Sequence, residues 1–202
     1  MLLYLIRHGQ TDWNRDHRVM GHTPVPLNER GRAGIEAVAL ALKAEGISVI
    51  YTSTVARALE SASILAEEWG ASLREEARLN EALFEPWVGM TYGELEASEQ
   101  FRLYLSAPSR ARFSTNEGMA DIQRRALAAV ERVIAETGAE RAAIVSHSDI
   151  IKPILTHYLG MDLDSMHRLS IANASVTLVD CSWAPPRIRF INLVPSKWLA
   201  KP

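Results

Sequence analysis

The sequence predicts an α/β protein, a three-layer α/β/α sandwich with a mostly parallel central sheet and a small helical cap insertion. Short runs of branched and aromatic apolar residues alternate with longer amphipathic segments along the 202 residues. Such alternation is typical of a parallel sheet with helices on both faces. Residues 86–116 break the rhythm with two prolines and two glycines around short helical pieces. We interpret this segment as the cap.

The predicted elements follow one another from strand to helix. Residues 2–6 are a short apolar run that stops at two basic side chains, as a buried strand does at its end. A helix with Asn28 as its N-cap follows and stops before Gly46. The other expected strands are residues 47–51, 141–146, 175–180 and 187–193, and the other expected helices are residues 55–69, 117–137 and 150–159.

Length and composition favour one domain over residues 1–202, with the cap insertion at about 86–116. A chain of this size with 48% hydrophobic residues can build one good-sized core. The single cysteine, Cys181, permits no intrachain disulfide and gives no sign of an oxidising compartment. The apolar run that opens the chain is too short for a signal-peptide core. We therefore expect a cytoplasmic protein.

Charge and hydropathy exclude two classes of partner. The net charge is −2, and the basic residues are scattered along the chain, so nucleic acid is not expected. No stretch reaches the roughly 18 apolar residues of a membrane span, so membrane insertion is not expected either. An exposed edge strand near the C-terminus could pair with a second copy and give a homodimer.

Basic side chains follow three of the predicted strands, at the point where each strand ends. Arg7 and His8 follow the first strand, Arg57 follows the second, and His147 follows the third. The carboxyl ends of parallel strands meet at one edge of a sheet, where ligands bind in such folds. Two arginines and two histidines together suit an anion, and a tetrahedral phosphate dianion fits arginine forks best. We expect a small phosphorylated metabolite as the ligand.

Four sequence blocks in order strengthen this expectation. The opening LIRHGQTDWN resembles the signature of the histidine phosphatase superfamily, which includes the cofactor-dependent phosphoglycerate mutases. The other matching blocks are TSTVARA at residues 52–58, LNE at residues 79–81 with Phe84, Trp87 and Gly89, and VSHS at residues 145–148. One Arg-His-Gly triplet is a weak signal, whereas four ordered blocks on predicted strand ends are specific.

The resemblance implies a reaction and a role for each matched residue. His8 would attack phosphorus and become a phosphohistidine. Glu81 matches the acidic residue of the family and would protonate the leaving oxygen and then activate water. Asn14 would contribute an uncharged donor. The basic side chains that would hold the non-bridging oxygens are Arg7, Arg57 and His147.

Four other residues fit either ligand contact or ordinary turn chemistry. These are Gly21, His22, Ser53 and Ser148. The remaining histidines, His17, His157 and His167, fall in no block, and we interpret them as surface or structural residues. The six histidines show no H-E-x-x-H spacing, and the chain has neither a C-x-x-C pair nor a P-loop. We expect no metal and no cofactor.

The chain departs from the family pattern at three places around the expected site. Asn80 stands where arginine is frequent, and Glu85 and Ser148 stand where glycine is frequent. A carboxylate at Glu85 could raise the pKa of Glu81 by like-charge repulsion or discourage highly anionic substrates.

Three functions remain open at this level. We favour a phosphomonoesterase of the histidine phosphatase type, because the cap is short and carries aromatic residues such as Trp87 and Tyr92. A cofactor-dependent phosphoglycerate mutase is the alternative that uses the same phosphohistidine. A non-catalytic module that binds phosphorylated ligands, or a scaffold, is the alternative of another class, although binding alone requires neither His8 nor Glu81.

Overall fold

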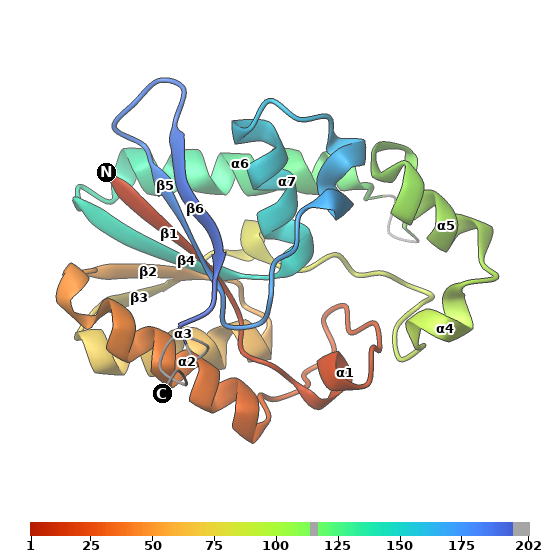
Figure 1. Cartoon of the computed structure of the whole chain (residues 1–202), viewed down its shortest axis with the longest axis horizontal. Coiled ribbons are helices and arrows are strands. Elements are labelled where there is room, and N and C mark those ends of the chain that lie inside the picture. The colour runs from red at the N-terminus through yellow and green to blue at the C-terminus, as the bar shows by residue number, and fades with distance from the viewer. Residues whose placement is uncertain (114–116, 196–202) are drawn as a thin grey trace.

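A six-stranded sheet forms the centre of the computed structural model, which describes residues 1–113 and 117–195 (Figure 1). The strand order is β3-β2-β4-β1-β5-β6. The four strands from β3 to β1 are parallel, whereas β5 and β6 are antiparallel to their neighbours. The strands are β1 (Leu2–Arg7), β2 (Val49–Thr52), β3 (Ser72–Glu75), β4 (Arg141–Ser146), β5 (Val176–Asp180) and β6 (Arg187–Leu193).

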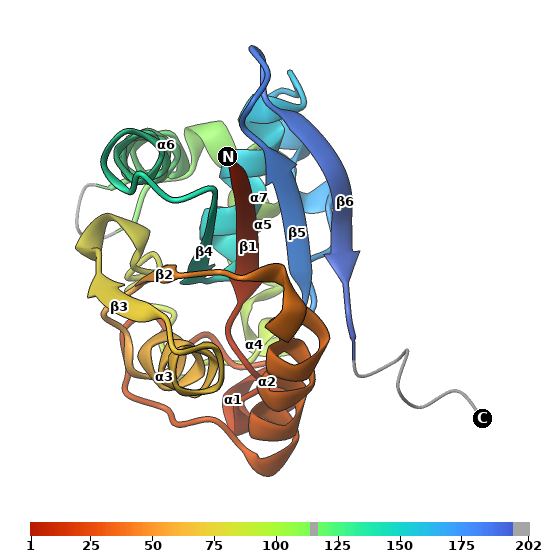
Figure 2. The ribbon, with the colours of Figure 1, turned by 90° about the vertical axis from the view of Figure 1, so that its left-hand side faces the viewer.

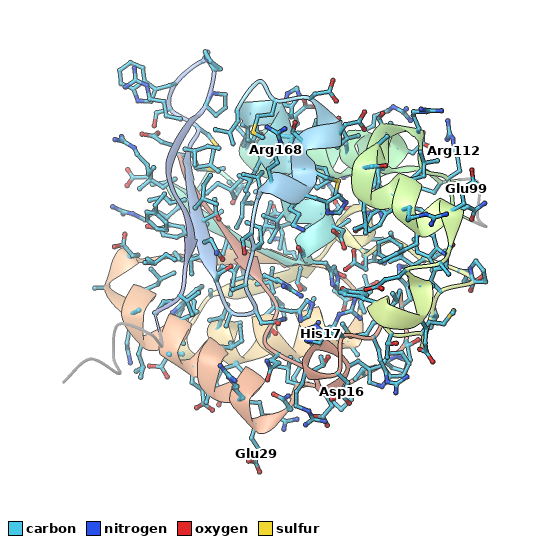
Figure 3. All side chains as sticks on the ribbon, turned by 45° about the vertical axis from the view of Figure 1, so that its right-hand side comes forward. Asp16, His17, Glu29, Glu99, Arg112 and Arg168 are labelled. Atoms are coloured by element: carbon cyan, nitrogen blue, oxygen red, sulfur yellow. The ribbon has the colours of Figure 1, made fainter. Side chains whose placement is uncertain are left out.

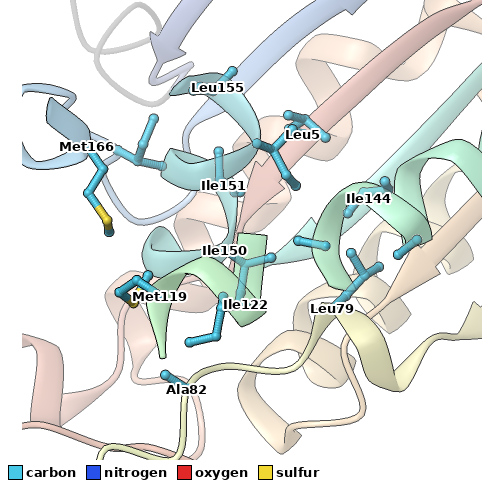
Figure 4. Packing of buried hydrophobic residues seen from close by; sticks show 14 of the residues in the cluster. Leu5, Leu79, Ala82, Met119, Ile122, Ile144, Ile150, Ile151, Leu155 and Met166 are labelled. Carbon is cyan, nitrogen blue, oxygen red and sulfur yellow. The ribbon is translucent and has the colours of Figure 1, made fainter. Parts of the chain in front are cut away.

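Helices cover both faces of this sheet, as the sequence predicts (Figure 2). One face packs against α2 (Glu29–Leu42) and α3 (Ala56–Trp69), and the other against α6 (Met119–Glu136) and α7 (Ser148–Tyr158). The side chains of β1 alternate between the two cores, because successive residues of a strand point to opposite faces. Leu3 and Leu5 enter the α6/α7 core, and Tyr4 and Ile6 enter the α2/α3 core. Figure 4 shows Leu5 and Ile144 from the strands with Ile122, Ile150 and Ile151 from the helices.

Shorter helices lie in the connecting segments. They are α1 (Asp12–Arg15), α4 (Tyr92–Leu95) and α5 (Glu99–Ser106), with 3₁₀ turns at η1 (Lys43–Glu45), η2 (Ala77–Leu79), η3 (Pro108–Arg110) and η4 (Leu163–Arg168). The segment that we interpret as a cap contains α4, α5 and η3, to one side of the sheet (Figure 1). Residues 114–116, the end of that segment, lie outside the described residues. Charged side chains such as Glu29, Glu99 and Arg112 are exposed on the surface (Figure 3).

The expected elements are found with small shifts at their ends, and the predicted fold class is confirmed. Asn28 caps α2 by accepting a hydrogen bond from Gly31 N at 2.8 Å. The strand β3 is not predicted from the sequence, because all four of its residues are exposed and no apolar run marks it. The last strand, β6, lies at the edge of the sheet. Its pairing with a second copy stays a prediction. Among the described residues, no helix has the length and apolar character to cross a membrane.

Two glycines bring the first turn of α2 against the loop after β1. A Cβ added to Gly31 would lie 2.0 Å from Gln10 O, and one added to Gly9 would lie 2.5 Å from Gly31 O. Both are backbone atoms that cannot swing aside. The position of the loop that follows His8 therefore depends on the absence of two side chains.

Replacing Gly31 with Ala should destabilise the protein. The added methyl group forces the two segments apart, and overpacking of this kind costs about 1–3 kcal/mol. For a chain of this size, thermal denaturation should show Tm lowered by about 2–4 °C for each kcal/mol. Gly93→Ala in α4 is the matched control, because nothing lies within 4 Å of the added Cβ. A Gly31→Ala variant as stable as Gly93→Ala would contradict the close approach.

Candidate active site

A cavity of about 530 Å³ lies beyond the carboxyl ends of β1, β2 and β4. Arg7, His8, Arg57 and Glu81 line its inner part, and residues of α4, α5, α7 and η4 line the rest. The three strand ends are neighbours because the chain places β4 between β1 and β2. The basic residues that the sequence analysis expected to converge therefore do so.

His8 is buried and held in one tautomer. Its Nδ1 lies 2.7 Å from Gly9 O, and Arg57 Nε donates to its Nε2 at 3.2 Å. A guanidinium can only donate, so Nε2 carries the lone pair and Nδ1 carries the hydrogen. Burial, helped by the charges of Arg57 and Arg7, holds the pKa of His8 well below its usual value. His8 is thus a neutral imidazole with a lone pair on Nε2.

Arg57 is a fully buried cation in the first turn of α3. Its Nη2 donates to Gly21 O at 3.0 Å and lies 3.7 Å from Glu81 Oε2. Burial lowers its pKa to about 10, against the favourable charge of Glu81, so the side chain stays charged at neutral pH. Arg7, at the end of β1, donates from Nη1 to Ile171 O at 2.6 Å. The two guanidiniums place two positive charges in the inner part of the cavity.

Three buried polar atoms of this cluster lack a hydrogen-bond partner among the described residues. They are Arg7 Nε, Arg57 Nη1 and His147 Nδ1. Buried polar groups are normally paired, and the exceptions need an explanation. Two of the three are cationic donors, so an anion with several acceptor oxygens is the ligand that would satisfy them.

Glu81 lies between Arg57, which lines the cavity, and His147, which is fully buried and is not among the residues that line it. Its Oε2 is 3.7 Å from Arg57 Nη2 and 3.7 Å from His147 Nδ1, and its Oε1 accepts from Ala82 N at 3.1 Å. Burial and the charge of Asp149 raise its pKa to about 7, although Arg57 acts in the opposite direction. The carboxyl group can therefore both give and take a proton near neutral pH.

Asp149 is one residue of the site that was not predicted from the sequence. It lies in the first turn of α7, two residues after His147, and it lines the cavity with Tyr104 and Lys152. The structure makes Asp149, and not the expected Glu85, the principal charge that raises the pKa of Glu81. The available signal was a carboxylate directly after the fourth block, but only the fold shows which way it faces.

Two asparagines support the loop that carries His8. Asn14 lines the cavity as expected, and its Oδ1 accepts from Thr11 N and from Asn173 Nδ2, both at 3.1 Å. Asn173 Nδ2 also lies 3.2 Å from His8 O. The described hydrogen bonds of the Asn14 side chain fall on Oδ1, so Nδ2 is the atom that can donate to a ligand. Asn173 stands before β5, far along the chain, and no motif marked it.

The four residues that fit either ligand contact or turn chemistry divide between the cavity and its surroundings. Gly21 and Ser148 line the cavity, and Gly21 O accepts from Arg57. His22 does not line it, and its Nε2 instead lies 2.7 Å from Glu81 O. Ser53 is fully buried and lies behind His147, with its Oγ 2.8 Å from His147 Nε2. His22 and Ser53 are therefore placed to position Glu81 and His147.

Aromatic residues form the outer wall of the cavity. Trp87 packs edge to face on Phe101 at 5.4 Å between ring centroids, and Phe84 and Tyr104 pack beside them. His167, which the sequence analysis placed outside the site, lines this wall too, and its Nε2 lies 3.0 Å from Tyr104 O. In the part of the chain that the structure describes, no group of three or more His, Cys, Asp or Glu residues is arranged to hold a metal ion.

A family model for the histidine phosphatase superfamily, branch 1, matches residues 3–194. The chain belongs to this superfamily. A probable phosphoglycerate mutase, GpmB, of Cronobacter sakazakii is 30% identical over 186 residues, which cover 91% of this chain and 86% of that protein. Its relatives thus include a protein named as a probable mutase, while a solved phosphatase shares its fold.

Two solved structures illustrate this shared fold. YhfR of Bacillus stearothermophilus is 30% identical with a TM-score of 0.89, and the match covers 96% of this chain and 97% of that one. A mycobacterial glucosyl-3-phosphoglycerate phosphatase is 27% identical with a TM-score of 0.84, and the match covers 95% and 99% of the two chains.

Replacing Asp149 with Asn should lower the pKa of Glu81 from about 7, because a negative charge in the same cavity no longer opposes ionisation of the carboxyl group. A ¹³C NMR titration of the Glu81 carboxyl carbon measures this pKa directly. Glu85→Gln is the matched control and should leave the Glu81 titration closer to that of the parent protein. The assignment of the effect to Asp149 fails if Glu85→Gln lowers the pKa and Asp149→Asn does not.

Proposed function

We propose that the protein is a phosphomonoesterase that hydrolyses small organic phosphates through a phosphohistidine on His8. The observation that carries the proposal is the state of His8, a neutral imidazole whose Nε2 lone pair accepts from the buried Arg57. Beside it, Arg57 Nη1 and Arg7 Nε are buried donors without a partner among the described residues. Neutral nitrogen is the nucleophile, and the guanidiniums supply the charge that holds a phosphoryl group.

In the first step, the Nε2 lone pair of His8 attacks phosphorus and the bond from phosphorus to the ester oxygen breaks. Glu81 gives its proton to the leaving alkoxide, which departs as an alcohol. Arg57 Nε, which donates to Nε2 at 3.2 Å, turns its donation to a non-bridging oxygen as the bond to phosphorus forms. Arg7 Nε and Arg57 Nη1 then find acceptors on the transferred group.

In the second step, Glu81 takes a proton from water while the water oxygen attacks phosphorus. The bond from phosphorus to Nε2 breaks, its electron pair returns to His8, and inorganic phosphate leaves. A carboxyl group with a pKa of about 7 serves both half-reactions, because its protonated and ionised forms are both populated near neutral pH.

A phosphoglycerate mutase is the second candidate, which the name of the Cronobacter relative favours. Arg18 and Lys152 line the cavity and could receive the carboxylate of a phosphoglycerate. The carboxylates of Glu96 and Asp149 line it as well and oppose any negative charge that the substrate carries besides its phosphate group. Together with the short cap segment, these two carboxylates support hydrolysis of esters that carry no charge besides the phosphate.

His8→Ala should abolish turnover and should no longer be labelled by a ³²P-phosphomonoester in rapid-quench experiments. The parent protein should give an adduct that is labile in acid and stable in alkali, as phosphohistidine is. His157→Ala, at an exposed histidine near the end of α7, is the control and should be labelled like the parent. A labelled His8→Ala protein that keeps its activity would exclude this mechanism.

Glu81→Gln should slow hydrolysis of the phosphohistidine by about 10²–10⁴-fold, the usual loss for a general acid or base. Phosphorylation of His8 should remain detectable with a good leaving group, which needs little protonation. Single-turnover assays with an aryl phosphate separate the two steps. A Glu81→Gln variant as fast as the parent in dephosphorylation would move the role to another carboxylate.

Hydrolysis and isomerisation can be separated with 3-phosphoglycerate and a 2,3-bisphosphoglycerate primer. We expect slow release of phosphate and little 2-phosphoglycerate from these substrates. An alkyl phosphate whose alkyl group is uncharged should give sustained release of phosphate. Rapid formation of 2-phosphoglycerate without release of phosphate would instead establish the mutase.

A further inference from the structure

A chain of hydrogen bonds behind the cavity ends at His147. Thr54 N donates to Asn80 Oδ1 at 2.8 Å, and because a backbone N–H cannot accept, the Asn80 atom at this position is the oxygen. Ser53 Oγ lies 3.0 Å from the same oxygen and must donate its hydrogen to it. His147 Nε2 lies 2.8 Å from Ser53 Oγ.

This chain decides which nitrogen of His147 carries the hydrogen. Ser53 has one hydroxyl hydrogen, and Asn80 Oδ1 receives it, so Ser53 Oγ can only accept from His147. His147 Nε2 must therefore be protonated. In the neutral ring, Nδ1 then holds a lone pair. The opposite tautomer would leave Ser53 with two acceptors and one hydrogen.

The other nitrogen of the ring faces the cluster of Glu81 and His8. His147 Nδ1 has no hydrogen-bond partner among the described residues and lies 3.7 Å from Glu81 Oε2, and the rings of His147 and His8 are 5.2 Å apart. Burial and the positive charges around it hold the pKa of His147 well below its usual value. The neutral ring therefore presents a lone pair, which repels the oxygens of a phosphate.

We propose that Ser53 and Asn80 are positioning residues that fix this tautomer of His147, so that binding of a phosphate dianion takes up one proton on His147 Nδ1. The inference rests on the proposed function, since it assumes that the ligand is a phosphoryl group held beside His8. The proton makes His147 an imidazolium whose Nδ1–H donates to a phosphate oxygen, while Nε2–H continues to donate to Ser53. Asn80, which stands where arginine is frequent in the family, is thereby given a role.

One proton is needed to convert the neutral His147 ring to an imidazolium when phosphate binds. The neutral ring and a phosphate dianion combine with one proton from solvent, or with the proton that a monoanion brings, to give an imidazolium and a dianion. The groups that face His147 from the surrounding elements are Arg7, His8, His22, Arg57 and Glu81. The positive groups oppose protonation, and the two negative charges of the ligand outweigh this opposition when it binds. Glu81 keeps its own proton for the leaving group.

The test counts protons during the binding of inorganic phosphate. Calorimetric titrations in buffers of different ionisation enthalpy give the number of protons taken up per phosphate, at about pH 9, where the ligand is a dianion. Every protein in this test carries Glu81→Gln, so that protonation of the Glu81 carboxyl group cannot contribute to the measured proton uptake. We expect about one proton for Glu81→Gln alone, and close to none after Ser53→Ala or Asn80→Ala is added, because Nδ1–H is then permitted in the neutral ring.

Thr54→Val in the same background is the matched control. It removes the hydroxyl group that contacts Asn80 but keeps the backbone donor that orients it, so about one proton should still be taken up. Binding of phosphate without proton uptake in the Glu81→Gln protein would overturn the inference. The inference would also be overturned if the proteins with Ser53→Ala or Asn80→Ala added took up as many protons as the protein with Glu81→Gln alone. A protein that binds no phosphate contradicts the proposed function itself.

A second measurement requires only the Glu81→Gln protein and so does not depend on how the added variants fold. The ¹⁵N chemical shifts of the His147 ring report which nitrogen is protonated. We expect hydrogen on Nε2 alone without phosphate and on both nitrogens with saturating phosphate. A neutral ring with hydrogen on Nδ1 in the absence of phosphate would contradict the direction of the hydrogen-bond chain.

Discussion

The hydrogen bond from Arg57 Nε to His8 Nε2 is the interaction on which the site depends. It decides where the lone pair of His8 lies, and it requires that the guanidinium of Arg57 be fully buried. Removing such a cation from water is costly unless it is paired. The pairing with Gly21 O and the Glu81 carboxyl group is incomplete, because Nη1 has no partner among the described residues. The unfinished pairing of Arg57 is the physical reason that the cavity favours an anion.

The fold supplies the rigidity that this interaction needs. The loop after β1 is fixed from three sides, by the close approach of Gly9 to Gly31, by Ser61 Oγ, which accepts from Gly9 N at 3.0 Å, and by Asn173. Ser61 lies in α3, the helix that also carries Arg57, and its hydroxyl donates to Arg57 O at 2.7 Å. The Ser61 hydroxyl therefore links the backbone next to His8 to the backbone of Arg57. A preorganised pair of this kind needs little rearrangement when charge develops on a ligand.

The features of the fold and the site that depend on local sequence patterns could be predicted from the sequence. The apolar run before Arg7, the Asn28 cap and the four blocks predicted the sheet edge at which the basic residues meet. Sequence reasoning did not find β3, whose side chains are exposed, or Asp149 and Asn173, whose importance arises from contacts across the fold. It assigned to Glu85 an electrostatic effect that belongs mainly to Asp149, since separation along the chain does not measure distance in space. Asn80 was visible only as a departure from a pattern, and its link to His147 through Ser53 required the geometry.

The central claim is that Nε2 of His8 is the nucleophile and that Nδ1 is reserved for Gly9 O. The two nitrogens of a histidine give different phosphohistidine isomers, and NMR distinguishes them through the coupling of phosphorus to the ring atoms. Trapping the phosphorylated protein in the Glu81→Gln variant and recording this coupling in ¹⁵N-histidine-labelled material tests the claim most directly. The structure predicts phosphorus on Nε2 of His8. Phosphorus on Nδ1, or on any residue other than His8, would contradict it.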